Sequence, residues 1–306
     1  MNHRLPRACL FAALIVALTA CSELLAGHTM VATVLQTPTL SVPPQAIAGL
    51  DASIPDGGFA FLDAGSWGFD GGFPFDAGVS FGGGVPIPGQ ALAHVFFGTL
   101  PTLDQSKPPA GVPGATVTAG AEGGTTYTLK DLGSGNYALS SAENTAFAYE
   151  SGKKYVFNIA HSGVSYKGTV LNAPTLEVIP ELHPALGYID LPARTSFTLK
   201  RPAPPSGQSE RNIAFVTVVP VSVSGNQGNP TYTNFPNDPF GILKLFAVPI
   251  EFKKETFVIP ASAFPEADKN YLIIFTTAKT GAGGPNINIF SAIAVGSADV
   301  GIVKTR

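Results

Sequence analysis

Apolar and polar residues alternate over short stretches of this chain with a period of about two, a pattern that is typical of β-strands. Residues 155–159 and 164–170 show it most clearly, and His161-Ser162-Gly163 between them predicts a tight hairpin. No stretch shows the ~3.6-residue apolar period of an amphipathic helix. Only residues 260–265, between two prolines, indicate a single helical turn. We therefore predict an all-β fold.

Short β-branched or aromatic runs recur along the rest of the chain, separated by Gly, Pro, Asn or Ser, and this arrangement favours antiparallel β-sandwiches. We expect two tandem sandwich domains, at 29–173 and 174–306. The strands predicted in the first are 30–42 (one kinked strand), 95–97, 115–118, 125–129, 137–139, 155–159 and 164–170. Those predicted in the second are 175–179, 195–199, 213–223, 241–248, 255–259, 271–277 and 287–295.

Residues 51–90 break this pattern and form a low-complexity insertion rich in Gly, Phe and Asp. Asp-Gly-Gly or Asp-Ala-Gly recurs along it, and the Asp-Ala-Gly units resemble spacers in surface lipoproteins of Gram-negative bacteria. Glycine loses much conformational entropy on ordering, so disorder is the default expectation. Six phenylalanines and Trp67 do not suit a pure spacer, because burying each would contribute roughly 1.5–3 kcal/mol. They either fold back onto the domain or offer an apolar surface to a partner. A calcium site is a weaker alternative, since the spacing matches neither an EF-hand nor a nonapeptide repeat.

The amino terminus has the organisation of an export signal. Arg4 and Arg7 precede the apolar residues 8–20, a run too short to span a bilayer, which takes about 20 residues. The run ends in Leu18-Thr19-Ala20-Cys21, which resembles a bacterial lipobox at all four positions. The alternative is an ordinary secretory leader with an incidental cysteine.

The lipoprotein resemblance implies a signal peptide at 1–20, cleavage between Ala20 and Cys21, and acyl chains such as palmitate on Cys21. Residues 21–28 would then form a tether to the membrane. Ser22 follows the cysteine, where Asp commonly marks inner-membrane retention in Gram-negative lipoproteins, so the resemblance implies the outer membrane. Its periplasmic and cell-surface faces both remain open.

The charge balance and the cysteine content exclude several classes of function. Loss of Arg4 and Arg7 from 18 basic residues would leave 16 against 21 acidic residues, a net charge of −5. No basic patch of the kind that binds nucleic acid is visible. Cys21 would be the only cysteine left and its thiol would carry lipid, which excludes disulfides, cysteine zinc sites and cysteine nucleophiles.

Two sub-sequences resemble an immunoglobulin-like sandwich. Phe257–Phe264 followed by Tyr271 looks like its strand E, helical turn and strand F, where a tyrosine hydroxyl bonds back to nearby backbone in a tyrosine corner. Residues 149–159, with Tyr155, repeat this pattern. In addition, 112–118 and 133–137 resemble carboxypeptidase-regulatory or transthyretin-like modules of exported bacterial proteins. The immunoglobulin cysteine pair is missing, and the only tryptophan lies in the insertion.

Catalytic patterns are not visible. We place His28 in the tether, His94 at the rim of a sheet, His161 at a hairpin tip and His183 in an interdomain linker. No Gly-x-Ser-x-Gly or His-Glu-x-x-His motif occurs, and Glu181 with His183 would supply at most two metal ligands. We therefore expect no enzyme activity, no metal and no cofactor. A hydrolase whose carboxylates meet only in space is the weakest alternative.

The loop at 226–240 is a candidate ligand-binding site. It combines amides with flat aromatic rings, a combination that sugar recognition uses and that ordinary Pro-rich loops also contain. The candidate residues are Asn226, Tyr232, Asn234, Phe235, Asn237, Asp238 and Phe240. Our first hypothesis is a structural or protein-interaction lipoprotein that meets another envelope protein, and a glycan-binding lipoprotein is the alternative.

Overall fold

The computed structural model describes residues 27–42, 85–87, 89–99, 110–204, 210–221, 229–235, 249–288 and 291–306. Within these ranges strands dominate, which confirms the all-β prediction. Helix is limited there to three short 3₁₀ turns, η1 (Pro180–Leu182), η2 (Pro249–Phe252) and η3 (Ala261–Ala263), the last of which is the turn predicted at 260–265. In the same ranges no helix is long and apolar enough to cross a membrane.

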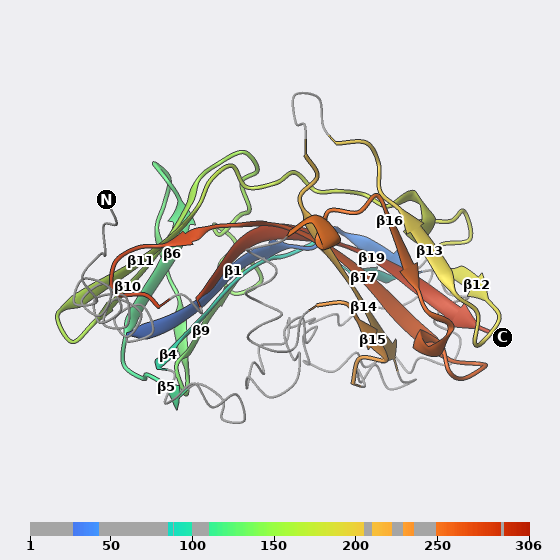
Figure 1. Ribbon diagram of the computed structural model, residues 1–306, viewed down its shortest axis with the longest axis horizontal. Helices are drawn as coiled ribbons and strands as arrows, with labels where there is room; N and C mark the ends of the chain where they lie inside the picture. The colour runs from blue at the N-terminus through green and yellow to red at the C-terminus, as the bar shows by residue number, and fades with distance from the viewer. Residues whose placement is uncertain are drawn as a thin grey trace, which may run out of the picture.

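A long sheet of ten strands runs from one end of the described part of the chain to the other (Figure 1). Its order is β15-β14-β17-β19-β1-β4-β9-β8, with β12 paired to β19 and β5 paired to β4. The strands are β1 (His28–Gln36), β4 (Ala91–Thr99), β5 (Ala110–Gly111), β8 (Lys130–Gly133), β9 (Asn136–Ser140), β12 (Ile189–Leu191), β14 (Ile213–Val221), β15 (Tyr232–Thr233), β17 (Asn270–Thr280) and β19 (Ala292–Thr305).

Three smaller sheets complete the described part, and none of its sheets is closed. The first has the order β18-β11-β10-β6-β7, the second pairs β13 with β16, and the third pairs β2 with β3. Their strands are β2 (Leu40–Val42), β3 (Val85–Ile87), β6 (Thr116–Ala121), β7 (Tyr127–Thr128), β10 (Tyr155–His161), β11 (Val164–Val170), β13 (Phe197–Lys200), β16 (Thr256–Ile259) and β18 (Ala282–Gly283).

Strand β19 joins the two halves of the long sheet. Its first residues pair in parallel with β1, its last three pair in parallel with β12, and β17 runs antiparallel along it from Ala294 to Lys304. Ile293 and Val295 of β19 belong to one hydrophobic core, whereas Val303 belongs to a second. One strand near the carboxyl end therefore contributes to both cores.

Both cores lie on the same face of the long sheet. Ile293, Val295 and Val303 are separated by even numbers of residues, and successive side chains of a strand point to opposite faces. Figure 1 shows the β6-β10-β11 sheet and the β13–β16 sheet on one side of the arch that the long sheet forms. We call this side the convex face and the reverse side the concave face.

The sequence located most strands, with specific exceptions. The hairpin at 161–164 is confirmed, because Ser162 and Gly163 both have positive φ (49° and 76°), as a two-residue type I′ turn requires. Residues 175–179 were expected as a strand but form none, and the short strands β3, β5, β8, β12, β15 and β18 were missed. The last strand runs from 292 to 305 instead of 287 to 295. The strand predicted at 241–248, and most of 51–90, lie outside the described residues.

Both predicted tyrosine corners are present. The Tyr155 hydroxyl accepts a hydrogen bond from the Glu150 backbone N–H at 2.7 Å, and the Tyr271 hydroxyl accepts one from the Glu266 N–H at 3.4 Å. In each case the donor lies five residues upstream, and each tyrosine lies at or next to the first residue of its strand.

The turns before the two tyrosines are built alike. Gly152 and Asp268 each lie three residues before the tyrosine and each has positive φ (75° and 56°). The Gly152 N–H donates to the Ala173 carbonyl at 2.7 Å, and the Asp268 N–H donates to the Thr305 carbonyl at 3.1 Å. The same local structure therefore occurs once in each half of the chain.

Candidate functional site

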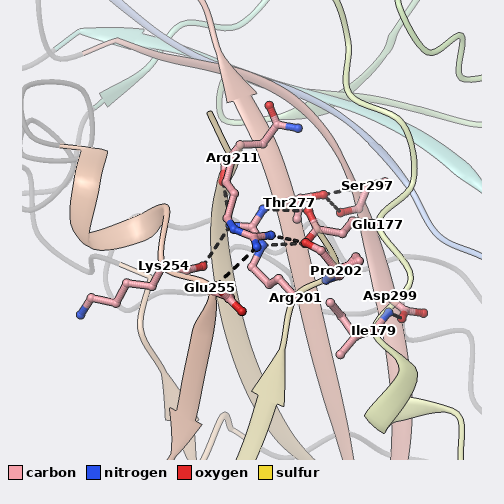
Figure 2. Close-up of polar contacts among 11 residues, drawn as sticks. Glu177, Ile179, Arg201, Pro202, Arg211, Lys254, Glu255, Thr277, Ser297 and Asp299 are labelled. Carbon is pink, nitrogen blue, oxygen red and sulfur yellow. Dashed lines mark hydrogen bonds and ion pairs between the residues drawn. The ribbon is translucent and has the colours of Figure 1, made fainter. Parts of the chain in front are cut away.

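A buried ion pair joins residues 175–183, the segment before β12, to the end of β13. Arg201, directly after β13, donates from Nε to Oε1 of Glu177 at 2.6 Å and from Nη2 to Oε2 at 2.7 Å (Figure 2). Its Nη1 donates to the Asn212 carbonyl at 2.9 Å, and its guanidinium carbon lies 5.7 Å from the ring centre of Phe275. The Arg201 side chain is almost fully buried and that of Glu177 is 16% exposed, so water screens the pair only weakly.

These contacts leave the guanidinium little capacity for a ligand. A fourth hydrogen bond, at 3.4 Å, joins Nη1 to the Lys254 carbonyl, so four of the roughly five N–H donors of arginine are engaged. Because other residues of the chain already accept hydrogen bonds from most N–H groups of Arg201, this side chain is better suited to stabilising the fold than to binding an anion.

A cavity of about 100 Å³ adjoins the ion pair. Its polar lining comes from Thr175, Glu177, Arg201, Arg211 and Asn212. Arg211 donates to the Pro202 carbonyl and lies 3.9 Å from the Glu255 carboxylate. Pockets for small organic ligands begin near ~300 Å³, so the cavity suits water molecules better than a substrate of ordinary size.

A second set of polar contacts joins residues 175–183 to β19. The carboxylate of Asp299 is buried, accepts the Ile179 N–H at 2.7 Å, and lies 2.8 Å from Nε2 of His183. Burial raises the pKa of Asp299, and the hydrogen bonds from Ile179 and His183 partly oppose that rise. Figure 2 shows Asp299 directed towards Ile179.

A histidine held by a buried carboxylate is also the orienting half of a hydrolase triad. The nucleophilic half would be a hydroxyl on the other ring nitrogen. Among the described residues, no serine or threonine makes a hydrogen bond to His183. Within that part of the chain the pair ties the linker segment to β19, and the sequence-based view of His183 as simple linker polarity missed this contact.

His28 begins β1 and lies in a cluster of rings at the other end of the molecule. It stacks on Phe97 with ring centres 4.7 Å apart and contacts Tyr166 edge-on at 4.8 Å. His161, from the hairpin tip, lies 6.2 Å away. Burial, and next the proximity of His161, lower the pKa of His28. Residue 28, expected in the tether, therefore lies in β1 instead, with its ring packed against Phe97 and Tyr166.

His94 was expected at the rim of a sheet, and this prediction is wrong. It lies in the middle of β4 on the concave face, opposite in direction to Ala93 and Val95, and only 3% of it is exposed. Burial lowers its pKa to about 4, and a hydrogen bond with Asn136 acts in the opposite direction. The side chain is thus held neutral at physiological pH.

Three candidate ligand-binding residues of the 226–240 loop lie in the described part. Tyr232 is in β15 and packs against the second core, Asn234 Oδ1 accepts the Val216 N–H at 2.6 Å, and Phe235 contacts Phe215 edge-on at 4.9 Å. These contacts engage the three side chains within the fold. The other candidates, Asn226, Asn237, Asp238 and Phe240, lie outside the described residues, as do Ala20 and Cys21.

Metal-binding residues do not gather in the described ranges, where no three His, Cys, Asp or Glu side chains are close enough to hold an ion. No protein-family model matches this chain. The search of curated proteins also found no match. Function is therefore inferred below from the residues and their arrangement.

Proposed function

We propose that the protein is a lipid-anchored scaffold of the bacterial outer membrane, which holds a rigid β-body at the membrane and meets another envelope protein. The observation that carries this proposal is the Leu18-Thr19-Ala20-Cys21 sequence, placed seven residues before the first residue of β1. Several acyl chains on Cys21 would anchor the chain stably, because each buried methylene adds about 0.8 kcal/mol. The body would then stand close to the bilayer.

The body itself would consist of two immunoglobulin-like modules. In the first, the order β1-β4-β9-β8 corresponds to strands A-B-E-D, and β6, β10 and β11 correspond to C, F and G. In the second, β13 and β16 correspond to B and E, β14, β17 and β19 to C, F and G, and β12 to an A strand parallel to G. The two tyrosine corners, each at the start of the strand assigned to F, support this correspondence.

Rigidity follows from the shared strand. Domains joined by a linker commonly move relative to one another. Here β19 pairs with β1 of the first half and β17 of the second, so bending between the halves would break main-chain hydrogen bonds. Such a body is suited to holding a binding surface at a fixed distance and orientation.

Edge strands are the surfaces that we assign to the partner. β8 ends the long sheet and all four of its residues are exposed, including Leu132 at 52%. β16 lies in a two-stranded sheet and presents Val258 at 59% exposure. A partner strand can pair with such an edge through main-chain hydrogen bonds.

The anchor is tested by membrane fractionation. Cys21→Ser should release the protein from the membrane fraction, and mass spectrometry of the wild-type amino-terminal peptide should find acylated Cys21. Ser22→Asp is the matched control, because it keeps the cysteine and should only move the protein to the inner membrane. An unmodified terminus, or an unchanged distribution of Cys21→Ser, would refute the anchor.

Partner binding is tested by photo-crosslinking in intact cells. A photoreactive amino acid at Leu132 or Val258 should give an adduct with one envelope protein, and the same probe at exposed Glu143 should not. Adducts absent from both edges, or equally abundant at Glu143, would contradict an edge-mediated interaction.

A further inference from the structure

The concave face of the long sheet is apolar across the junction of the two halves. Ile274 and Val300 are direct partners across β17 and β19, and both point away from the core that contains Phe275. Leu35 and Leu92 are likewise partners across β1 and β4. The first core contains Val34, Ala91 and Ala93, which adjoin these two residues in the chain, but neither Leu35 nor Leu92. A continuous apolar surface therefore lies opposite both cores.

The side chains of this surface are buried in the folded chain. Ile274 is 2% exposed and Val300 3% exposed. Among the described residues, Phe235 and Phe252 pack with Phe215 at the β14 end of the surface. The cores on the convex face include neither Ile274 nor Val300. Another layer is therefore needed on the concave side.

The chain that leads to the segment between Val42 and Val85 leaves the long sheet at the junction of the two halves. Gln36 pairs with both Ser297 and Ala91, so the β1–β4 hairpin leaves the long sheet near the middle of β19. The hairpin continues as β2 and β3, where Val42 pairs with Val85. The segment between them, 43–84, has 42 residues and lies outside the described ranges. A loop of that length that returns to its origin can reach about 70 Å, and β19 is only about 45 Å long.

The composition of 43–84 matches an apolar surface. It contains six phenylalanines and Trp67, five aspartates and no Lys or Arg. Phenylalanine and tryptophan bury large apolar areas. The glycines between them place little steric restriction on the backbone, so it can adapt to the shape of a surface.

We propose that residues 43–84 dock onto the concave face and that their aromatic side chains form its missing layer. The segment is then a built-in part of the fold, neither a free spacer nor a surface for an external partner. Docking joins the two halves on the concave side, as β19 joins them within the sheet.

Trp67 is the only tryptophan of the chain and therefore reports on this docking directly. The full-length processed protein is reconstituted in phosphatidylethanolamine–phosphatidylglycerol vesicles, and Trp67 fluorescence is measured with acrylamide and with brominated lipids. We expect blue-shifted emission that neither quencher reduces strongly, with full acrylamide quenching in urea. A chain that lacks the lipid on Cys21 gives the same result in solution, so failure of this proposal is distinguishable from failure of the anchor.

Two sets of variants test which surface Trp67 contacts. Ile274→Ser on the concave face should increase acrylamide quenching of Trp67 several-fold, and Val258→Ser on exposed β16 should not. Because Ile274→Ser also weakens the sheet, the second set changes the segment alone. Phe69→Ser, Phe73→Ser and Phe75→Ser together should lower the melting temperature and increase binding of an apolar dye. Asp63→Ser, Asp70→Ser and Asp76→Ser together should do neither.

Three outcomes would overturn the proposal. Strong acrylamide quenching in the native protein would show a solvated segment, and strong quenching by brominated lipids would show insertion into the bilayer. Protection that disappears on dilution, together with a dimer in sedimentation, would show that a second copy covers the face.

Discussion

His94 is an ionisable ring enclosed in an apolar face, and it should make the protein sensitive to acid. Its folded-state pKa is about 4, whereas an unfolded histidine titrates near ~6.5. Between these values the unfolded chain binds a proton that the folded chain does not, so stability falls as the pH decreases. The expected loss is about 3 kcal/mol between pH 6.5 and 4. Urea unfolding of wild type and His94→Leu at pH 7 and pH 4.5 checks this, because the variant should show a clearly smaller pH dependence. Equal slopes would contradict it.

The tyrosine corners predict the effect of deleting one oxygen atom. Tyr155→Phe and Tyr271→Phe should each reduce the free energy of unfolding by about 1 kcal/mol, the usual contribution of a hydrogen bond. The larger effect is expected at Tyr155, whose hydrogen bond is 2.7 Å long against 3.4 Å at Tyr271. Tyr188→Phe is the control, since the Tyr188 hydroxyl makes no hydrogen bond to another described residue. Unchanged melting temperatures for both corner variants would show that these bonds add nothing.

The Arg201–Glu177 pair should couple strongly in a double-mutant cycle. Arg201→Met leaves a carboxylate that is largely shielded from water, and removing one partner of a buried pair costs about 3–5 kcal/mol. Adding Glu177→Leu removes that uncompensated charge, so the double variant should be more stable than Arg201→Met alone. Additive effects in urea unfolding would instead indicate two independent side chains. The same treatment of Lys154 and Glu122, an exposed pair 2.6 Å apart, should give little coupling.

At the scale of strands, the sequence was informative wherever contacts are local. The hairpin at 161–164 and the turn at 260–265 depend on residues close in the chain, and both were predicted. Residues 175–179 have an alternating pattern but form no strand, because the Glu177 side chain and the Ile179 N–H bind residues 24 and 120 positions away. Such partners leave no trace in a local pattern. β3, β5, β12, β15 and β18 were missed because two or three residues are too few to show a period, and β8 was missed because its four residues are all exposed and do not alternate.

The candidate site also depends on contacts between residues far apart in the chain, which a local sequence pattern does not reveal. Asp299 was the detectable signal, since it is the one charged residue within the apolar run 292–303. A buried carboxylate needs partners, but nothing local identifies His183 and Ile179 as those partners. The end of β19 was also missed, because Gly296, Ser297 and Gly301 interrupt its apolar alternation. These small residues allow close approach, as an added Cβ at Gly296 would lie 2.0 Å from the Thr277 carbonyl oxygen.

At the scale of the whole molecule, the shared strand predicts that both halves unfold together. Gly296 pairs with Leu35 of β1 and Ala278 of β17, at the junction of the two halves. Gly296→Val forces a side chain against the Thr277 backbone, and overpacking of this kind costs about 1–3 kcal/mol. Because β19 serves both cores, the variant should lose hydrogen-exchange protection in β10 and in β16 to a similar degree. Wild type and variant should each show one calorimetric transition.

Gly124→Ala is the control, because its added Cβ meets nothing closer than 3.4 Å and should leave exchange unchanged. Two separate transitions, or loss of protection in β16 alone, would mean that the halves are independent domains and that β19 only bridges them.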